Sequence, residues 1–172
     1  MPDIAGSLAR SAAPIVFVMA LICLASPCLA GSERATLAGV QGVKVVVDID
    51  CDSARGLPES SVRRDVEQML RAQHVAVLTE APWAETVARA VLRVDIECED
   101  GPAKTTVYSA TLELEQAVRL ARDSAMLVSA PTWWSPTKAG ALGGDVARGL
   151  REIVRDLVEL FLADYAKANP RR

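Results

Sequence analysis

Apolar and polar side chains alternate, with Val46 as an exception, in two short segments of the chain. In residues 43–51 (VKVVVDIDC) every odd-numbered position is apolar or cysteine, and most even-numbered positions are polar. Residues 91–98 (VLRVDIEC) repeat this alternation and share the motif V-D-I-D/E-C. A period of two is typical of a half-buried β-strand. The sequence therefore predicts two strands with matching faces, and we expect them to lie side by side.

Three further strands are predicted from the same pattern. Residues 75–78 form a short apolar run, and residues 105–120 alternate over a longer stretch. After turn residues at 122–124, residues 125–134 return as the partner of a hairpin. The segment 135–144 is rich in proline and glycine, so we expect a loop there.

Two amphipathic helices are predicted around these strands. Pro58 suits a first helical position, and apolar residues recur at helical spacing from Val62 to Leu70. Asp145 is a good N-cap for a last helix that continues to about Ala168. That helix carries an apolar stripe made of Val146, Leu150, Ile153, Val154, Leu157, Phe161 and Tyr165.

The order β-α-β-β-β-β-α predicts an α+β fold. We expect one mostly antiparallel sheet with two helices packed on one face, because each amphipathic element must bury its apolar side. The helix between the first strand and residues 75–78 makes those two strands parallel if they share the sheet.

The start of the chain has the pattern of a signal peptide. Residues 14–30 carry no charge, and small residues Cys28 and Ala30 stand three and one positions before Gly31. We interpret residues 1–30 as a cleavable leader, 31–42 as a flexible lead-in and 43–170 as a single domain. An uncleaved N-terminal anchor is the alternative. No later stretch is long and apolar enough to span a bilayer.

Charge and cysteine usage fit an exported protein. The chain has 19 basic and 22 acidic residues, so removing Arg10 and Asp3 with the leader leaves 18 and 21. This weak acidity argues against nucleic acid and anionic membranes as partners. Cys51 and Cys98 remain, and an even pair in an oxidising compartment suggests a disulfide. Two buried thiols are the alternative.

Two groups of residues are candidate sites. The polar faces of the matching strands bring together Asp48, Asp50, Asp95 and Glu97, whose carboxylates suit calcium. No EF-hand spacing is present, and a solvated strand face is the simpler explanation of these residues. Adjacent Trp133 and Trp134 face opposite sides of a strand, so one is free to anchor a partner. The alternative is that the glycine-rich loop covers it.

No catalytic constellation is recognisable in the sequence. His74 is the single histidine, and a triad also needs a nucleophile and an orienting acid beside it. We therefore assign no catalytic residue and no resident cofactor.

The mature chain resembles an uncharacterised family of small exported bacterial proteins. The resemblance covers nearly all of it and is most specific at the end, in a Thr-Trp pair, a glycine-rich loop and the helix ending FLADYAKANP. It implies a fold and an exported location but no reaction. Two positions depart from the family pattern. His74 stands where glycine is common, which implies a left-handed residue after the first helix, and Pro131 precedes the Thr-Trp pair, which favours an edge strand.

The sequence leaves three functional hypotheses. The first is a non-enzymatic binding or structural module, exported to the periplasm or cell envelope or secreted, which holds an envelope protein partner. The second is a calcium-binding domain that uses the acidic sheet face. The third is an uncharacterised enzyme. The sequence does not indicate an oligomeric state.

Overall fold

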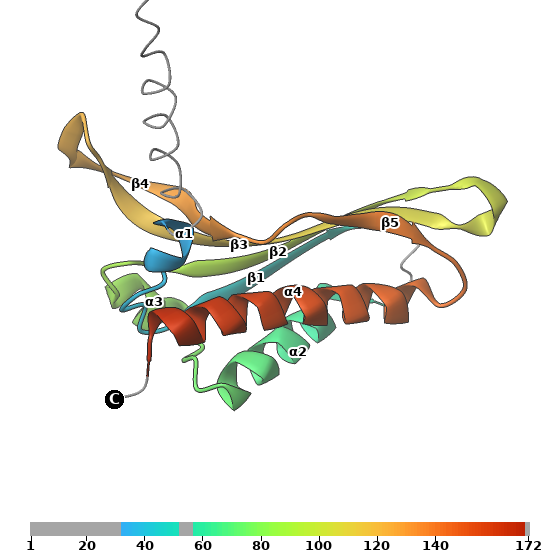
Figure 1. Ribbon diagram of the computed structural model, residues 1–172, viewed down its shortest axis with the longest axis horizontal. Helices are drawn as coiled ribbons and strands as arrows, with labels where there is room; N and C mark the ends of the chain where they lie inside the picture. Colours follow the sequence, from blue (N-terminus) through green and yellow to red (C-terminus); the bar gives the residue numbers. More distant parts are fainter. Residues whose placement is uncertain (1–31, 52–56, 171–172) are drawn as a thin grey trace, which may run out of the picture.

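The computed structural model describes residues 32–51 and 57–170 (Figure 1). The interpretation of residues 1–30 as a signal peptide lies outside these residues. In chain order the elements are α1 (Ser32–Ala35), β1 (Lys44–Asp50), α2 (Glu59–Ala72), α3 (Glu80–Glu85), β2 (Val91–Asp100), a 3-10 turn (Pro102–Lys104), β3 (Thr106–Leu120), β4 (Asp123–Trp134), β5 (Lys138–Leu142) and α4 (Val146–Ala168).

One five-stranded sheet organises the molecule, and the fold is α+β as predicted. The strands run in the order β1-β2-β3-β4, and β5 continues on the β4 side by pairing with the start of β3. β1 and β2 are parallel, with Val47 beside Val94, whereas β2, β3, β4 and β5 are paired antiparallel. The two strands with matching faces therefore lie side by side, as expected.

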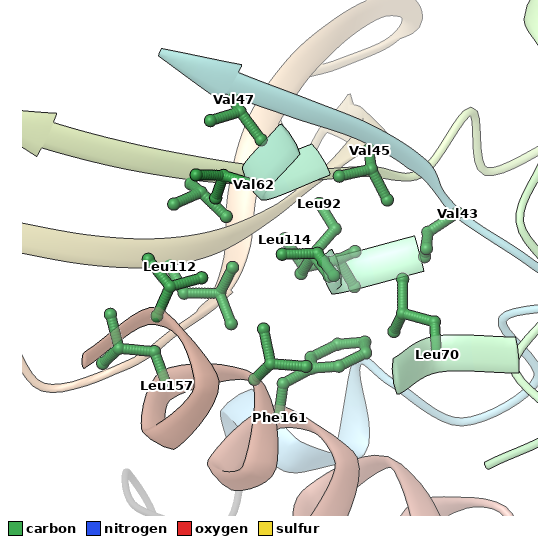
Figure 2. Close-up of a cluster of buried hydrophobic side chains, with 14 of the residues drawn as sticks. Val43, Val45, Val47, Val62, Leu70, Leu92, Leu112, Leu114, Leu157 and Phe161 are labelled. Carbon is green, nitrogen blue, oxygen red and sulfur yellow. The ribbon is translucent and has the colours of Figure 1, made fainter. Parts of the chain in front are cut away.

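Helices α2 and α4 cover one face of this sheet, and the core lies between the two layers (Figures 1 and 2). The sheet contributes one apolar residue from every second position, including Val45, Leu92 and Leu114. The helices contribute the residues predicted from their helical spacing, which include Val62, Val66 and Leu70 from α2 and Leu150, Val154, Leu157 and Phe161 from α4. No described helix could cross a membrane on its length and apolar content.

Three local features follow from chemistry that the sequence indicates: two helix ends and one residue of an edge strand. Asp145 caps α4 by accepting a hydrogen bond from the Arg148 amide, with a nitrogen–oxygen distance of 3.0 Å. His74 adopts φ 63°, the left-handed conformation expected for the residue that ends α2. Pro131 lies in β4, at the edge of the sheet, which is where a residue without an N–H is tolerated.

Three segments differ from the sequence-based predictions. Residues 75–78 form a single parallel bridge, Val43 to Val77, and no named strand. The expected loop 135–144 contains β5. Gly140 lies opposite Tyr108 there, and a Cβ at that glycine would stand 3.2 Å from the tyrosine ring, so the ring fills the space left by the glycine.

The lead-in 31–42 was expected to be flexible, but its described part packs against the fold at Leu37 and Val40. Leu37 and Val40 are buried, because α4 holds this segment by its last residues. The Tyr165 hydroxyl donates to the Val40 carbonyl at 2.8 Å, and the Asn169 amide nitrogen donates to the Leu37 carbonyl at 2.9 Å. The prediction was based on the small and polar residues of the segment, and it overlooked the two apolar side chains that contact the core.

Candidate functional site

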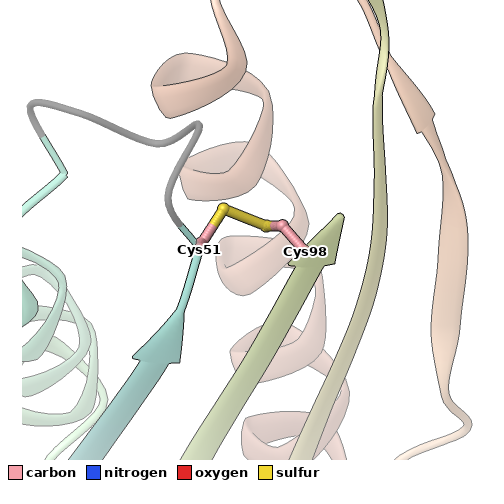
Figure 3. The surroundings of a disulfide bond; sticks show 2 residues. All are labelled: Cys51 and Cys98. Atoms are coloured by element: carbon pink, nitrogen blue, oxygen red, sulfur yellow. A yellow bond between two sulfur atoms is a disulfide. The ribbon is translucent and has the colours of Figure 1, made fainter. Parts of the chain in front are cut away.

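A disulfide joins Cys51 and Cys98 at the ends of β1 and β2 (Figure 3). The parallel register pairs Asp50 with Glu97, so the cysteines occupy the next position on each strand. Their Cα atoms are 4.6 Å apart, within the range that a disulfide spans. This is the pairing expected from the matching strand faces. It links β1 covalently to β2 through two cysteines that are 47 residues apart in the chain.

The candidate carboxylates lie on the sheet face opposite the helices. The register places Asp48 beside Asp95 and Asp50 beside Glu97, as the sequence predicts for adjacent strands. Arg93, two residues before Asp95 on β2, bridges Asp48 of β1 at 2.5 Å and Glu115 of β3 at 3.0 Å. The hydrogen bond to Glu115 is the main reason that the pKa of Arg93 is raised, with Asp48 adding to it.

This acidic face is neutralised in part by a protein cation. Like charges on neighbouring strands repel one another, and a guanidinium between two carboxylates relieves that repulsion. Within residues 32–51 and 57–170, no group of three or more His, Cys, Asp or Glu side chains is arranged to hold a metal ion. The chemistry visible at this face is therefore an ion-pair network.

The two tryptophans at the end of β4 have different environments. Trp133 is buried under α4, where its ring packs edge-on against Phe161 with 5.2 Å between centroids. Its indole Nε1 donates to Asp164 at 3.3 Å. Trp134 points the other way along the strand alternation and keeps 48% of its surface exposed. The glycine-rich segment does not cover it, because residues 138–142 pair with β3 as β5.

Trp134 borders a surface cleft of about 380 Å³ between α1, the end of β4 and α4. Pro136 and the half-exposed Leu160 give the cleft an apolar side, and Glu33, Arg34 and Asp164 give it a charged rim. We call this site the Trp134 cleft. Trp133 contributes to its floor.

Asp164 links Trp133, in the floor of the Trp134 cleft, to Arg34 at its charged rim. Its carboxylate accepts from Trp133 and from Arg34, whose Nε lies 2.8 Å away, and Lys167 stands at 3.7 Å. The sequence pattern indicated the two tryptophans but gave no indication of Arg34 and Leu160. Asp164 lies three residues after Phe161 on α4. The sequence marks it only as a polar residue beside the apolar stripe of that helix.

The distinctive end of the chain therefore has a structural explanation. In the segment FLADYAKANP, Phe161 packs in the core, Asp164 holds Trp133 and Arg34, and Tyr165 and Asn169 hold the lead-in. Burial raises the pKa of the Tyr165 hydroxyl, which donates a hydrogen bond to the Val40 carbonyl. These residues build one side of the molecule, next to the Trp134 cleft.

His74 borders a different cavity, of about 520 Å³, between the end of α2 and α4. Tyr165 and Asn169 also line it, and both are already bonded to the lead-in. No carboxylate, serine, threonine or cysteine is among the residues that line this cavity in the described part of the chain. His74 thus stands without the partners of a hydrolytic triad.

A third hollow of about 480 Å³ runs between α2 and α4 on the side away from the sheet. Val66, Met69 and Val154 line it, and Arg151 closes part of it by bonding to Asp65 at 2.6 Å and to Ser61 at 2.7 Å. The groove is thus the seam between the two packed helices, bridged by an ion pair.

Comparison with known proteins identifies no family. No protein-family model and no curated protein matches the chain. Two solved PelC dodecamers from Paraburkholderia phytofirmans, one of them a point variant, are 25% and 23% identical. Each aligns over 74% of this chain and 90% or 89% of its own, at a TM-score of 0.41. A minor lipoprotein from Acinetobacter baumannii is 10% identical over 75% of this chain and 93% of its own, at 0.37. These TM-scores lie below 0.5, so the likenesses assign no function.

Proposed function

We propose that this chain is an exported, non-catalytic binding module of the periplasm or cell envelope that holds a protein partner at the Trp134 cleft. The Cys51–Cys98 disulfide supports export, because such bonds persist in oxidising compartments. The uncharged leader pattern at residues 14–30 and the resemblance to small exported bacterial proteins support the same location.

The main observation behind this proposal is the exposure of Trp134. A tryptophan in a folded protein buries a large apolar surface, and burial of such surface is worth about 25 cal/mol per Å². Trp134 leaves 48% of its surface in water, and Leu160 across the cleft leaves 43%. Tryptophan is enriched among the few residues that dominate protein–protein binding energy. The pair therefore offers an anchor that a partner would cover.

The surroundings of Trp134 are rigid, which favours binding. Trp133, the adjacent residue, is locked by Phe161 and by its hydrogen bond to Asp164. A preorganised site loses less conformational entropy when a partner docks. Charged groups at the rim, Arg34 and Glu33, would orient the partner more than they would strengthen its binding.

Site-specific photocrosslinking in the native host tests this function. The change is Trp134→benzoylphenylalanine in the full-length protein, and the matched control is Val107→benzoylphenylalanine. Val107 has a similar exposure of 45% but lies away from the Trp134 cleft, near the start of β3 and opposite Glu99, whereas Trp134 pairs with Glu113. We expect one discrete adduct of higher mass from position 134 and none from position 107. Adding Leu160→Asp to the position 134 variant should remove the adduct.

Two results would contradict the proposal. One is the absence of an adduct at position 134 in both the soluble periplasmic and the membrane fractions. The other is the same set of adducts from positions 134 and 107, which would indicate random collisions. Once the partner is identified, Trp134→Ala should weaken its binding about 30-fold or more, the loss typical of a central anchor residue.

A further inference from the structure

The cations near the Trp134 cleft are already engaged, whereas one of its carboxylates is not. Arg34 at the rim and Lys167, one turn after Asp164 on α4, both interact with Asp164, at 2.8 Å and 3.7 Å. Glu33 also lines the cleft. Within residues 32–51 and 57–170, its carboxylate has no ion-pair or hydrogen-bond partner. The rim therefore presents an uncompensated negative charge.

A second carboxylate of this kind lies beside Trp134 on the sheet. Glu113 of β3 is the direct partner of Trp134 in the antiparallel register, so both side chains project from the same face with Cβ atoms about 5 Å apart. On its other side Glu113 lies opposite Arg93 of β2, but the guanidinium of Arg93 is bonded to Asp48 and Glu115. Among the described residues, Glu113 thus has no cation of its own.

The protein contains the same combination elsewhere with a cation in place. The Nζ of Lys44 stands 4.8 Å from the centre of the Trp83 ring and forms an ion pair with Glu80. The face of an indole ring attracts a cation, and a carboxylate beside the ring adds to that attraction. No cation of the described chain stands over the ring of Trp134, which is 48% exposed. The groups that hold Lys44 at Trp83 are therefore present at Trp134 without their cation.

We propose that the Trp134 cleft recognises a positively charged side chain of the partner protein, arginine above all. The guanidinium stacks on the ring of Trp134, with Glu33 and Glu113 on either side. Apolar residues that flank the arginine in the partner pack on Pro136 and Leu160, the apolar side of the cleft. Arginine suits the site better than lysine, because its planar group stacks on aromatic rings and is less strongly hydrated. This inference rests on the proposed function and specifies the chemistry of the partner.

An acidic segment of a partner fits the same cleft poorly. Its charge would face Glu33 and Glu113, and like charges at close range repel one another. The one cation that lines the cleft, Arg34, is held by Asp164, so an anion could use it only by breaking that ion pair. Charge complementarity therefore favours a basic anchor.

Titration of the mature, oxidised protein with two matched peptides tests this inference. The probes are Ac-Gly-Leu-Arg-Leu-Gly-NH2 and the same peptide with citrulline, which has the shape of arginine without its charge. Binding is followed by the NMR shift of the Trp134 indole N–H. We expect the arginine peptide to bind at least about fivefold more tightly, through one cation–π contact and two surface charge pairs. Equal binding of the two peptides would overturn the inference, as would an arginine peptide that does not bind at millimolar concentration.

Variants of the carboxylates assign this preference to the cleft. Glu33→Gln and Glu113→Gln should each weaken binding of the arginine peptide about two- to fourfold and leave the citrulline peptide unchanged. The matched control is Glu152→Gln, at an exposed carboxylate of α4 that does not line the cleft, and it should change neither peptide. A charge preference of undiminished size in the variant with both Glu33→Gln and Glu113→Gln would also overturn the inference.

The peptide titration and the photocrosslinking experiment separate this inference from the proposed function. An adduct at position 134 combined with equal binding of the two peptides would support the protein partner and overturn only its basic anchor. The absence of the adduct would contradict the proposed function itself, and with it the assignment of the cation to a partner protein.

Discussion

Removal of the disulfide should cost this protein a large part of its stability. The change is the double substitution Cys51→Ala and Cys98→Ala, which keeps small side chains at two half-buried positions next to the core. The bond closes a loop with a sequence separation of 47 residues. The chain-entropy relation for a loop of that length gives about 4 kcal/mol, and native disulfides in small exported domains typically contribute 2–5 kcal/mol. That is a substantial fraction of the roughly 5–15 kcal/mol available to a domain.

Urea denaturation of four samples measures this contribution. The unsubstituted protein and the double alanine variant are each compared with and without reductant at one pH. We expect the reduced protein and the variant to unfold at similar, lower urea concentrations. The variant serves as the control for the reductant, because its own midpoint should not move. A reduced protein within about 0.5 kcal/mol of the oxidised one would refute the reasoning.

Two further predictions concern the aromatic residues near α4. Trp133→Ala should cost about 3–5 kcal/mol in urea unfolding because it empties a core site, whereas Trp134→Ala should stay within about 0.5 kcal/mol; equal losses would contradict their different burial. For Tyr165, burial raises the pKa above its ordinary value of 10.0, so the folded state favours the neutral phenol. The contribution of Tyr165 to the free energy of unfolding is then complete below about pH 10 and is lost as the pH rises through the folded pKa. Tyr165→Phe should lower stability by about 1 kcal/mol at pH 8 through loss of the bond to Val40, and the difference from the unmodified protein should shrink towards pH 11; a constant difference in urea midpoints would contradict it.

The strands and helices of the core could be predicted because their signals are local. The alternation in residues 43–51 and 91–98 reports burial of one sheet face, and the helical spacing from Val62 to Leu70 reports burial of one helix face. The shared V-D-I-D/E-C motif also predicted that Cys51 and Cys98 lie close together, because residues at equivalent positions of two matching parallel strands are neighbours.

The parts that were missed depend on contacts distant in sequence. β5 forms because Gly140 can lie under Tyr108, a residue 32 positions earlier, and composition alone favours a loop there. The lead-in is ordered by Tyr165 and Asn169, more than 120 residues away. The Trp134 cleft depends likewise on Arg34 and Asp164, which no short motif connects.

The most direct test of the central claim, that this is an exported and oxidised binding module, is the intact mass of the protein recovered from its native host. The account predicts a chain that begins near Gly31, has a mass about 2 Da below that of the dithiol form, and becomes alkylated at Cys51 and Cys98 only after reduction. A full-length chain from the cytosol that retains Met1 and is alkylated at these cysteines without reductant would contradict it.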